Sequence, residues 1–129
     1  RRQRQMCIRD RISTSGQLPL VSGSLPMTGL VGDQISQGDA AGQARVAALN
    51  ALAAAADVAG GVNNIRRVVR VVVYVASTAD FTAQPAVANG ASELFGEIFG
   101  DAGRHIRSAI GVASLPLGAP VKVELTVQV

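Results

Sequence analysis

Aromatic residues are scarce in this 129-residue chain: they make up 3% of it, and tryptophan is absent. A long aromatic platform for stacking single-stranded nucleic acid is therefore excluded. One cysteine, Cys7, and one histidine, His105, leave neither a disulfide framework nor a Cys/His zinc motif. No apolar run approaches the roughly 20 residues that a membrane-spanning helix needs. We expect a cytoplasmic protein with no membrane span, no metal and no cofactor.

Several common catalytic motifs are also missing. The chain has no Gly-x-Ser-x-Gly elbow, no Gly-x-Gly-x-x-Gly fingerprint and no Gly-x-x-x-x-Gly-Lys loop. These absences disfavour serine hydrolases, dinucleotide-binding enzymes and nucleoside triphosphatases. As a lone imidazole between Arg104 and Arg107, His105 is interpreted as a turn or interface residue and receives no catalytic role.

The basic charge of the chain is concentrated at its N-terminus. Removing the five arginines and one aspartate of residues 1–11 from the totals of 12 basic and 9 acidic residues leaves 7 and 8, a net charge of −1. That balance gives no electrostatic case for binding nucleic acid or an anionic membrane. The string QMCIRDR at residues 5–11 resembles the translation of a sequencing-library adapter. We interpret residues 1–11 as a non-native leader that replaces the native N-terminus, with a native basic or transit-like arm as the alternative.

The remaining residues, 12–129, are predicted to form one domain. Turn formers break residues 13–32 into short extended pieces. Apolar periodicity then predicts, in chain order, a helix, a strand, a helix and two strands at residues 36–59, 65–76, 85–99, 106–115 and 121–129. Gly60-Gly61 and Gly100 are expected to end the helices, and residues 116–120 form a turn between the last two strands.

The predicted elements define an α+β fold in which two helices cover one face of a single sheet. The helix core stripes are expected at Leu49, Leu52, Ala55, Ala56 and Ala59, and at Ala91, Leu94, Phe95, Ile98 and Phe99. In the strand at 65–76, simple alternation places Val69, Val71, Val73 and Val75 on one face. The other face of this strand is also partly apolar, so we expect a second chain to cover it and a binding site at the subunit boundary.

Arg107 is the most informative polar residue because it opens an otherwise apolar strand. A guanidinium at a sheet end beside a subunit boundary can bind a carboxylate through two parallel hydrogen bonds. An intersubunit ion pair or a solvated strand end is the structural alternative.

The C-terminal sequence carries a family resemblance. The string Arg107-Ser-x-x-x-Val-Ala-x-Leu-Pro-x-Gly-x-x-Val-x-Val-Glu124, together with Ser-Gly-Gln-Leu-Pro at residues 15–19, closely resembles the RidA/YjgF family, also called endoribonuclease L-PSP-like proteins. The resemblance covers residues 13–129. It implies a chorismate-mutase-like α+β fold assembled as a homotrimer.

The resemblance also implies an activity, the hydrolysis of reactive 2-imino or 2-enamino acids to 2-keto acids and ammonia. Arg107 matches the arginine that holds the substrate carboxylate, and Ser15 and Gly16 match a Ser-Gly pair that lines the same pocket. Asn89 matches an asparagine at the start of the second helix. From the residues alone, Ser15-Gly16 is a turn and Asn89 a helix cap.

Two positions depart from the family pattern. Counting from Leu115-Pro116, the family's water-positioning glutamate falls on Lys122, and a cysteine common in the deaminases is Ala109. Glu124 lies on the same strand face as Lys122, about 7 Å further along, which is too far for it to replace that glutamate without a local shift. Lys122 is either an exposed lysine that protects an edge strand or a second cation beside Arg107, which would strengthen anion binding and weaken hydrolysis.

Three functions therefore remain. The first is an imine deaminase in which Arg107 holds the substrate and Ser15, Gly16, Asn89, Lys122 and Glu124 line the pocket. The second is a receptor for small carboxylates such as keto acids, without turnover. A ribonuclease is disfavoured by the net charge of residues 12–129 and by the absence of a His or Lys pair suited to phosphodiester chemistry.

Overall fold

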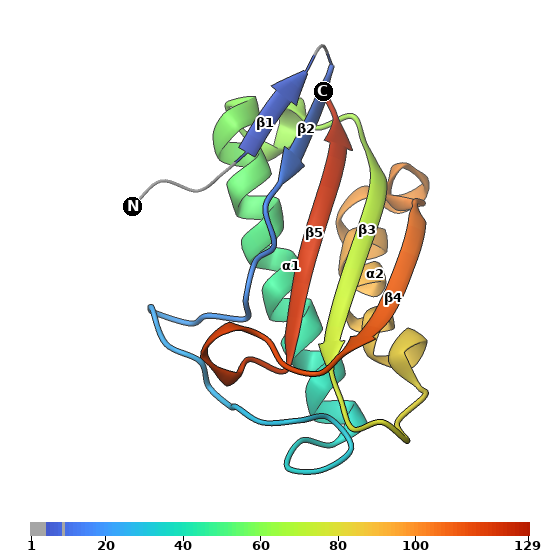
Figure 1. Cartoon of the computed structure of the whole chain (residues 1–129). Coiled ribbons are helices and arrows are strands. Elements are labelled where there is room, and N and C mark those ends of the chain that lie inside the picture. Colours follow the sequence, from blue (N-terminus) through green and yellow to red (C-terminus); the bar gives the residue numbers. More distant parts are fainter. Residues whose placement is uncertain (1–4, 9) are drawn as a thin grey trace.

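The computed structural model describes the backbone of residues 5–8 and 10–129 and the side chains of residues 10–129 (Figure 1). Its strands are β1 (Gln5–Ile8), β2 (Arg11–Thr14), β3 (Arg67–Ala76), β4 (Ile106–Val112) and β5 (Val121–Gln128). Its helices are α1 (Gln37–Ala59) and α2 (Gln84–Phe99). Short 3-10 turns occupy Val62–Asn64, Gly100–Gly103 and Pro116–Gly118.

The described strands form one sheet in the order β1-β2-β5-β3-β4. β4 runs parallel to β3, and every other neighbouring pair is antiparallel. The two closing strands are therefore not a hairpin. The segment at 116–120 carries the chain past the end of β3, so that β3 lies between β4 and β5 (Figure 1).

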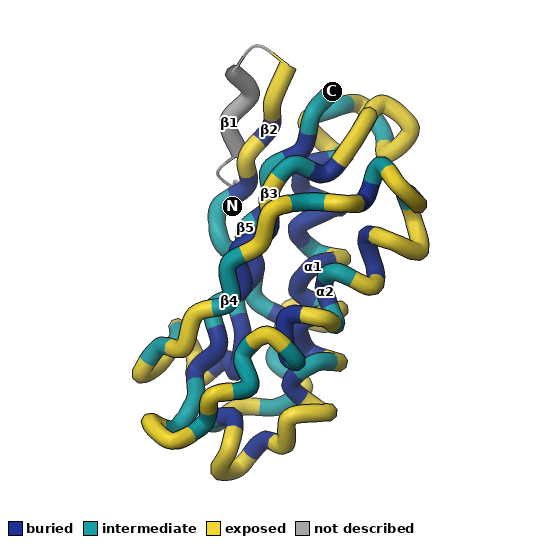
Figure 2. The backbone as a smooth tube through the Cα atoms, turned by 90° about the vertical axis from the view of Figure 1, so that its right-hand side faces the viewer, coloured by how far each residue is buried: buried dark blue, intermediate teal, exposed yellow. Residues whose placement is uncertain are grey.

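Both helices cover the same face of this sheet, as the sequence predicts (Figure 2). The side chains of Val121, Val123, Leu125 and Val127 on β5 are at most 1% exposed and point toward the helices. The intervening residues of β5 are partly exposed, because alternate side chains of a strand point to opposite faces. We call the helix-covered side the covered face and the other side the open face. The predicted α+β fold class is confirmed.

A β-bulge changes which valines of β3 face the helices. Val68 pairs with Val127 and Arg70 with Thr126, so Val69 is an extra residue with no partner on β5. Simple alternation is therefore wrong at this point: Val68 and Val71 are both fully buried on the covered face, and Val69 is only partly buried. The bulge turns Arg70 to the open face beside Thr126.

Small side chains allow α1 to lie close to its neighbours. Ser36 caps the helix by accepting the Asp39 backbone N–H at 3.1 Å, and Gly60 ends it with a φ of 85°. Nine residues of α1 are buried, and seven of them are alanine: Ala40, Gln43, Ala44, Ala47, Ala48, Ala51, Leu52, Ala54 and Ala55. The predicted stripes are wrong at Leu49 and Ile98, which are 52% and 42% exposed. The residues that α1 buries are therefore determined by small side-chain size as well as by hydrophobicity.

The N-terminal residues add an edge strand to the sheet. The backbone of β1 pairs antiparallel with β2, and β2 pairs with β5. The side chain of Cys7 lies outside the described residues, and the non-native origin of residues 1–11 stays a prediction. No helix in the described part of the chain is long and apolar enough to cross a membrane.

The contact between α1 and α2 gives a test of this packing. A Cβ at Gly90 of α2 would lie 2.8 Å from the carbonyl carbon of Ala41 and closer still to its oxygen. Gly90→Ala should therefore lower the free energy of unfolding by about 1–3 kcal/mol, because the two backbones must separate. Gly96→Ala is the matched control, since a Cβ there meets open space. It should raise the free energy of unfolding by about 0.5–1 kcal/mol through helix propensity. Urea denaturation of both variants measures the difference, and equal effects would contradict the packing argument.

Candidate functional site

The predicted arginine lies in a hydrogen-bonded group at the β4 edge of the sheet. We call Asn89, Ser92, His105 and Arg107 the edge cluster. Arg107 Nη1 donates to Asn89 Oδ1 at 2.7 Å and to Ser92 Oγ at 3.2 Å. Asn89 and Ser92 are three residues apart on α2, a spacing that puts both side chains on one side of a helix. The helix therefore holds one nitrogen of the guanidinium with two oxygens.

His105 fixes the orientation of Ser92. Its Nδ1 lies 2.6 Å from the carbonyl oxygen of Gly103, and its Nε2 lies 2.9 Å from Ser92 Oγ. Because a carbonyl oxygen only accepts, Nδ1 carries the proton of this contact, and Nε2 shares a hydrogen bond with the Ser92 hydroxyl. Ser92 Oγ also accepts the Arg107 N–H. Phe95 supports the imidazole in an edge-on contact, with ring centroids 6.0 Å apart.

The rest of the Arg107 guanidinium is available to a ligand. Its side chain is exposed, and it forms no ion pair with an acidic residue in the described part of the chain. A guanidinium has five N–H donors, and the edge cluster uses Nη1 alone. The outward donors have the planar geometry that binds a carboxylate through two hydrogen bonds.

A second group of predicted residues lies on the open face. We call Gly16, Tyr74, Lys122 and Glu124 the open-face cluster. The Tyr74 hydroxyl donates to Glu124 Oε1 at 3.3 Å, and Lys122 Nζ lies 5.0 Å from the centroid of the Tyr74 ring. The stem of Lys122 crosses directly over Gly16, where a Cβ would lie 2.7 Å from its Cγ. A larger residue at this position would push the flexible lysine stem aside.

The Tyr74 phenol sits in an environment that opposes its ionisation. Partial burial raises the pKa of Tyr74, and the negative charge of Glu124 and its hydrogen bond to the phenol raise it further. Arg70 opposes the shift weakly. The neutral phenol therefore remains a hydrogen-bond donor to the Glu124 carboxylate.

The edge cluster and the open-face cluster lie on opposite sides of one chain. Arg107 pairs with Val71, which is buried on the covered face, whereas Lys122 pairs with Tyr74 and Glu124 with Val72 on the open face. Paired residues of neighbouring strands point to the same face. The alternative in which Lys122 is a second cation beside Arg107 is therefore not met within one chain.

The remaining predicted residues are placed as follows. Ser15 precedes Gly16 near Lys122, and its backbone carbonyl accepts from Gln17 Nε2 at 3.2 Å. Asn89 lies in the second turn of α2, which begins at Gln84, so it is neither at the start of the helix nor a cap. The covered-face side chain Ala109 packs against the core.

Sequence reasoning did not identify Ser92 and Tyr74 as members of these clusters. The three-residue spacing of Ser92 from Asn89 was a usable signal. Tyr74 had no such signal, because its pairing with Lys122 depends on the sheet order. Within the described residues, no group of three or more His, Cys, Asp or Glu side chains could hold a metal ion.

Comparison with known proteins identifies a family and several similar chains. The family model described as "YjgF/chorismate mutase-like, putative endoribonuclease" matches residues 4–129. Protein TCP17 of Trypanosoma cruzi is 39% identical over 124 residues, which cover 95% of this chain and 78% of that protein. The crystal structure of Atu1372, a protein of unknown function from Agrobacterium tumefaciens, is 38% identical with a TM-score of 0.94, covering 97% of this chain and 80% of that one. The structure of the E. coli YjgF gene product is 25% identical with a TM-score of 0.67, covering 96% and 84%.

The open-face cluster predicts a specific titration. Because the chain has one tyrosine and no tryptophan, phenolate absorbance reports Tyr74 alone. We expect this absorbance to rise at a higher pH than in a model peptide, and Glu124→Gln to lower the pKa because the neighbouring negative charge is removed. Glu93→Gln, a change at an exposed acid on α2, is the matched control and should leave the curve unchanged. Superimposable curves for the native protein and Glu124→Gln would contradict the arrangement.

Proposed function

The chain belongs to the YjgF/chorismate mutase-like family, and from that premise we propose that it is a cytoplasmic deaminase of 2-imino and 2-enamino acids. In the proposed reaction, water adds to the imine carbon, the nitrogen gains a proton, and the C–N bond breaks. The products are a 2-keto acid and ammonia. An enamine first takes a proton on carbon to become the imine. An imine carbon is intrinsically electrophilic, so orientation and charge complementarity supply much of the rate.

The observation that carries this proposal is the arrangement around Arg107. Two oxygens from α2 hold one nitrogen, and no described acidic residue neutralises the guanidinium. Its remaining donors suit the carboxylate that every 2-imino acid carries next to the reacting carbon. A clamp of this kind fixes the position of the imine carbon relative to the protein.

We further propose that Glu124 supplies the acid–base group. A proton acceptor is needed, and a lysine ammonium has donors but no lone pair for this task. Lys122 was aligned with the family glutamate by counting residues from Leu115-Pro116, across the loop at 115–120. Loops vary in length between relatives, so the aligned position can differ by a few residues. Glu124 has a carboxylate on the same face, next to a phenol that donates to it.

A shared site between two copies follows if Arg107 and Glu124 act together. They lie on opposite faces of one sheet, so one chain does not bring both to one small substrate. The open face of β4 carries Ile106 and Ile110, which are 64% and 42% exposed. Covering this apolar surface with a second chain would be favourable. A homotrimer, in which each open face meets the edge cluster of a neighbour, fulfils both requirements.

A carboxylate receptor without turnover is the alternative. The stem of Lys122 lies over Gly16. In this alternative the chain would bind keto acids through Arg107, while Lys122 blocks the approach of water.

Hydrolysis of 2-iminobutanoate and 2-iminopropanoate, measured above the rate in free solution, separates these functions. The native protein should accelerate both reactions. Arg107→Lys should lower kcat/KM at least about tenfold, because a lysine cannot form two parallel hydrogen bonds. Glu124→Gln should lower kcat about 10²–10⁴-fold if the carboxylate moves a proton.

Glu93→Gln is the control for the loss of an acid and should retain full activity. If the native protein is inactive and Lys122→Glu is active, the receptor function is supported instead. If neither hydrolyses an imine and neither binds a keto acid, the proposal is wrong.

Subunit mixing tests the shared site directly. Arg107→Ala and Glu124→Gln proteins should each be nearly inactive. After the two are mixed, unfolded and refolded together, roughly a quarter of the sites would combine an intact arginine from one chain with an intact glutamate from another. Activity should recover to about that fraction. No recovery, with trimers confirmed by light scattering, would mean that both residues act from the same chain.

A further inference from the structure

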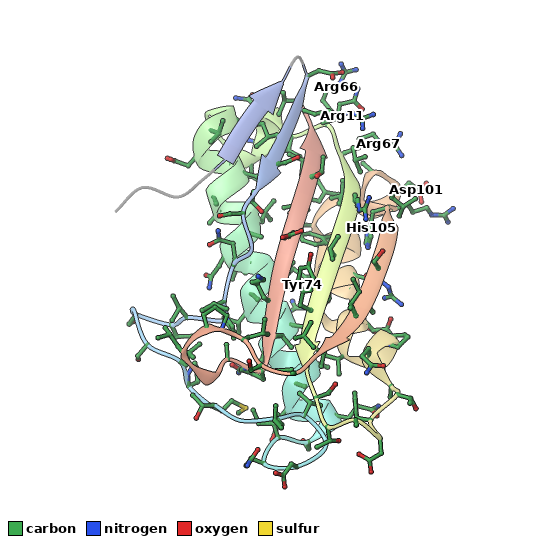
Figure 3. The ribbon with its side chains drawn as sticks, in the orientation of Figure 1. Arg11, Arg66, Arg67, Tyr74, Asp101 and His105 are labelled. Atoms are coloured by element: carbon green, nitrogen blue, oxygen red, sulfur yellow. The ribbon has the colours of Figure 1, made fainter. Side chains whose placement is uncertain are left out.

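A cavity of about 340 Å³ opens at the end of the sheet where β3 and β4 begin. Its lining combines basic and apolar side chains: Arg11, Arg67, Val68, Val69, Arg104, His105, Ile106 and Gln128. Figure 3 shows Arg11, Arg66 and Arg67 together at this end of the molecule, on the same side as His105 and Asp101. Neither the resemblance to the family nor the proposed deaminase function uses these arginines.

The positive charge of this cavity is poorly compensated. In the part of the chain that the structure describes, Arg11 and Arg67 form no ion pair. Arg104 has one contact, of 3.8 Å, with Asp101, and both side chains are almost fully exposed. Such an exposed pair contributes little. The Asp10 carboxylate accepts from Gln128 Nε2 at 3.0 Å rather than from an arginine.

The bulge in β3 helps to form the cavity. Arg67 pairs with Gln128 immediately before the bulge, and the extra residue, Val69, is part of the lining. Bulges redirect side chains and are common beside binding sites. Here Val69 and Ile106 form an apolar wall beside the guanidinium groups, while the side chain of Val68 is buried in the core.

We propose that this cavity binds the phosphate monoester of a small organic molecule. A phosphate monoester carries a charge of about −1.5 to −2 at neutral pH and presents three acceptor oxygens, which suits several guanidinium groups at once. The apolar wall would contact the organic part of the ligand. The volume lies within the range of small-molecule pockets. The site depends on Arg67 and Arg104, and Arg11, which belongs to the predicted leader, adds to it.

The cavity shares two side chains with the proposed deaminase assembly: His105 belongs to the edge cluster, and Ile106 lies on the apolar surface that the proposed homotrimer would cover. Arg107 is not part of the cavity lining, and Arg67 and Arg104 take no part in the edge cluster. Imine hydrolysis by the Arg67→Ala and Arg104→Ala proteins therefore reports on the deaminase site, and phosphate-ester binding reports on the cavity.

Calorimetric titration with adenosine monophosphate, adenosine and inorganic phosphate tests the proposal. We expect adenosine monophosphate to bind, inorganic phosphate to compete with it, and adenosine to bind at least about tenfold more weakly. Arg67→Ala and Arg104→Ala should each weaken binding of the monophosphate about tenfold or more. Arg66→Ala is the matched control, because it removes the same charge from the same end of the chain but does not line the cavity.

Three outcomes would overturn the proposal. The first is equal weakening by Arg66→Ala and Arg67→Ala, which would indicate general electrostatic attraction. The second is equal binding of adenosine and its monophosphate. The third is binding of a single-stranded RNA oligonucleotide with no measurable binding of adenosine monophosphate. Circular dichroism and the imine assay on each variant show whether a loss of binding reflects misfolding.

Discussion

The close contact between the two helices fixes the geometry of the rest of the molecule. Gly90 of α2 lies against the backbone of Ala41, and a row of alanines on α1 faces the core. Small side chains let both helices fit on one face of the sheet without large separation. That contact also sets the position of α2, which carries Asn89 and Ser92 to the edge of the sheet. The orientation of Arg107 therefore depends on packing more than ten residues away along the chain.

Because both helices cover the same face of the sheet, the candidate polar residues lie on two different surfaces. A strand points alternate side chains to opposite faces, so adjacent residues of a strand lie in different environments. Arg107 is on the side of the helices, and Lys122 and Glu124 are on the side that the helices leave open. An assembly of several copies is the simplest way for both groups to act on one substrate. The apolar side chains of the open face favour the same assembly.

The bulge at Val69 affects both the core and the cavity at the end of the sheet. It keeps Val68 and Val71 in the core, and it turns Arg70 outward. It also borders the cavity at which Arg67, Arg104 and His105 meet. His105 belongs both to the cavity lining and to the edge cluster, since Nε2 contacts Ser92 and Nδ1 contacts the carbonyl oxygen of Gly103.

The sequence by itself determined the α+β class, the order of the elements from α1 onward and the C-terminal ends of both helices, because caps, glycines and apolar periodicity act over a few residues. It did not predict β1, which lies within the residues interpreted as a leader. It also identified Arg107, whose charge stands out in an apolar strand. The exposed Leu49, the bulge, the position of β3 between β4 and β5, and the separation of Arg107 from Lys122 were decided by the tertiary structure. Each of these depends on which strand pairs with which and how closely a helix approaches. Such contacts join residues far apart in the chain, and no local pattern encodes them.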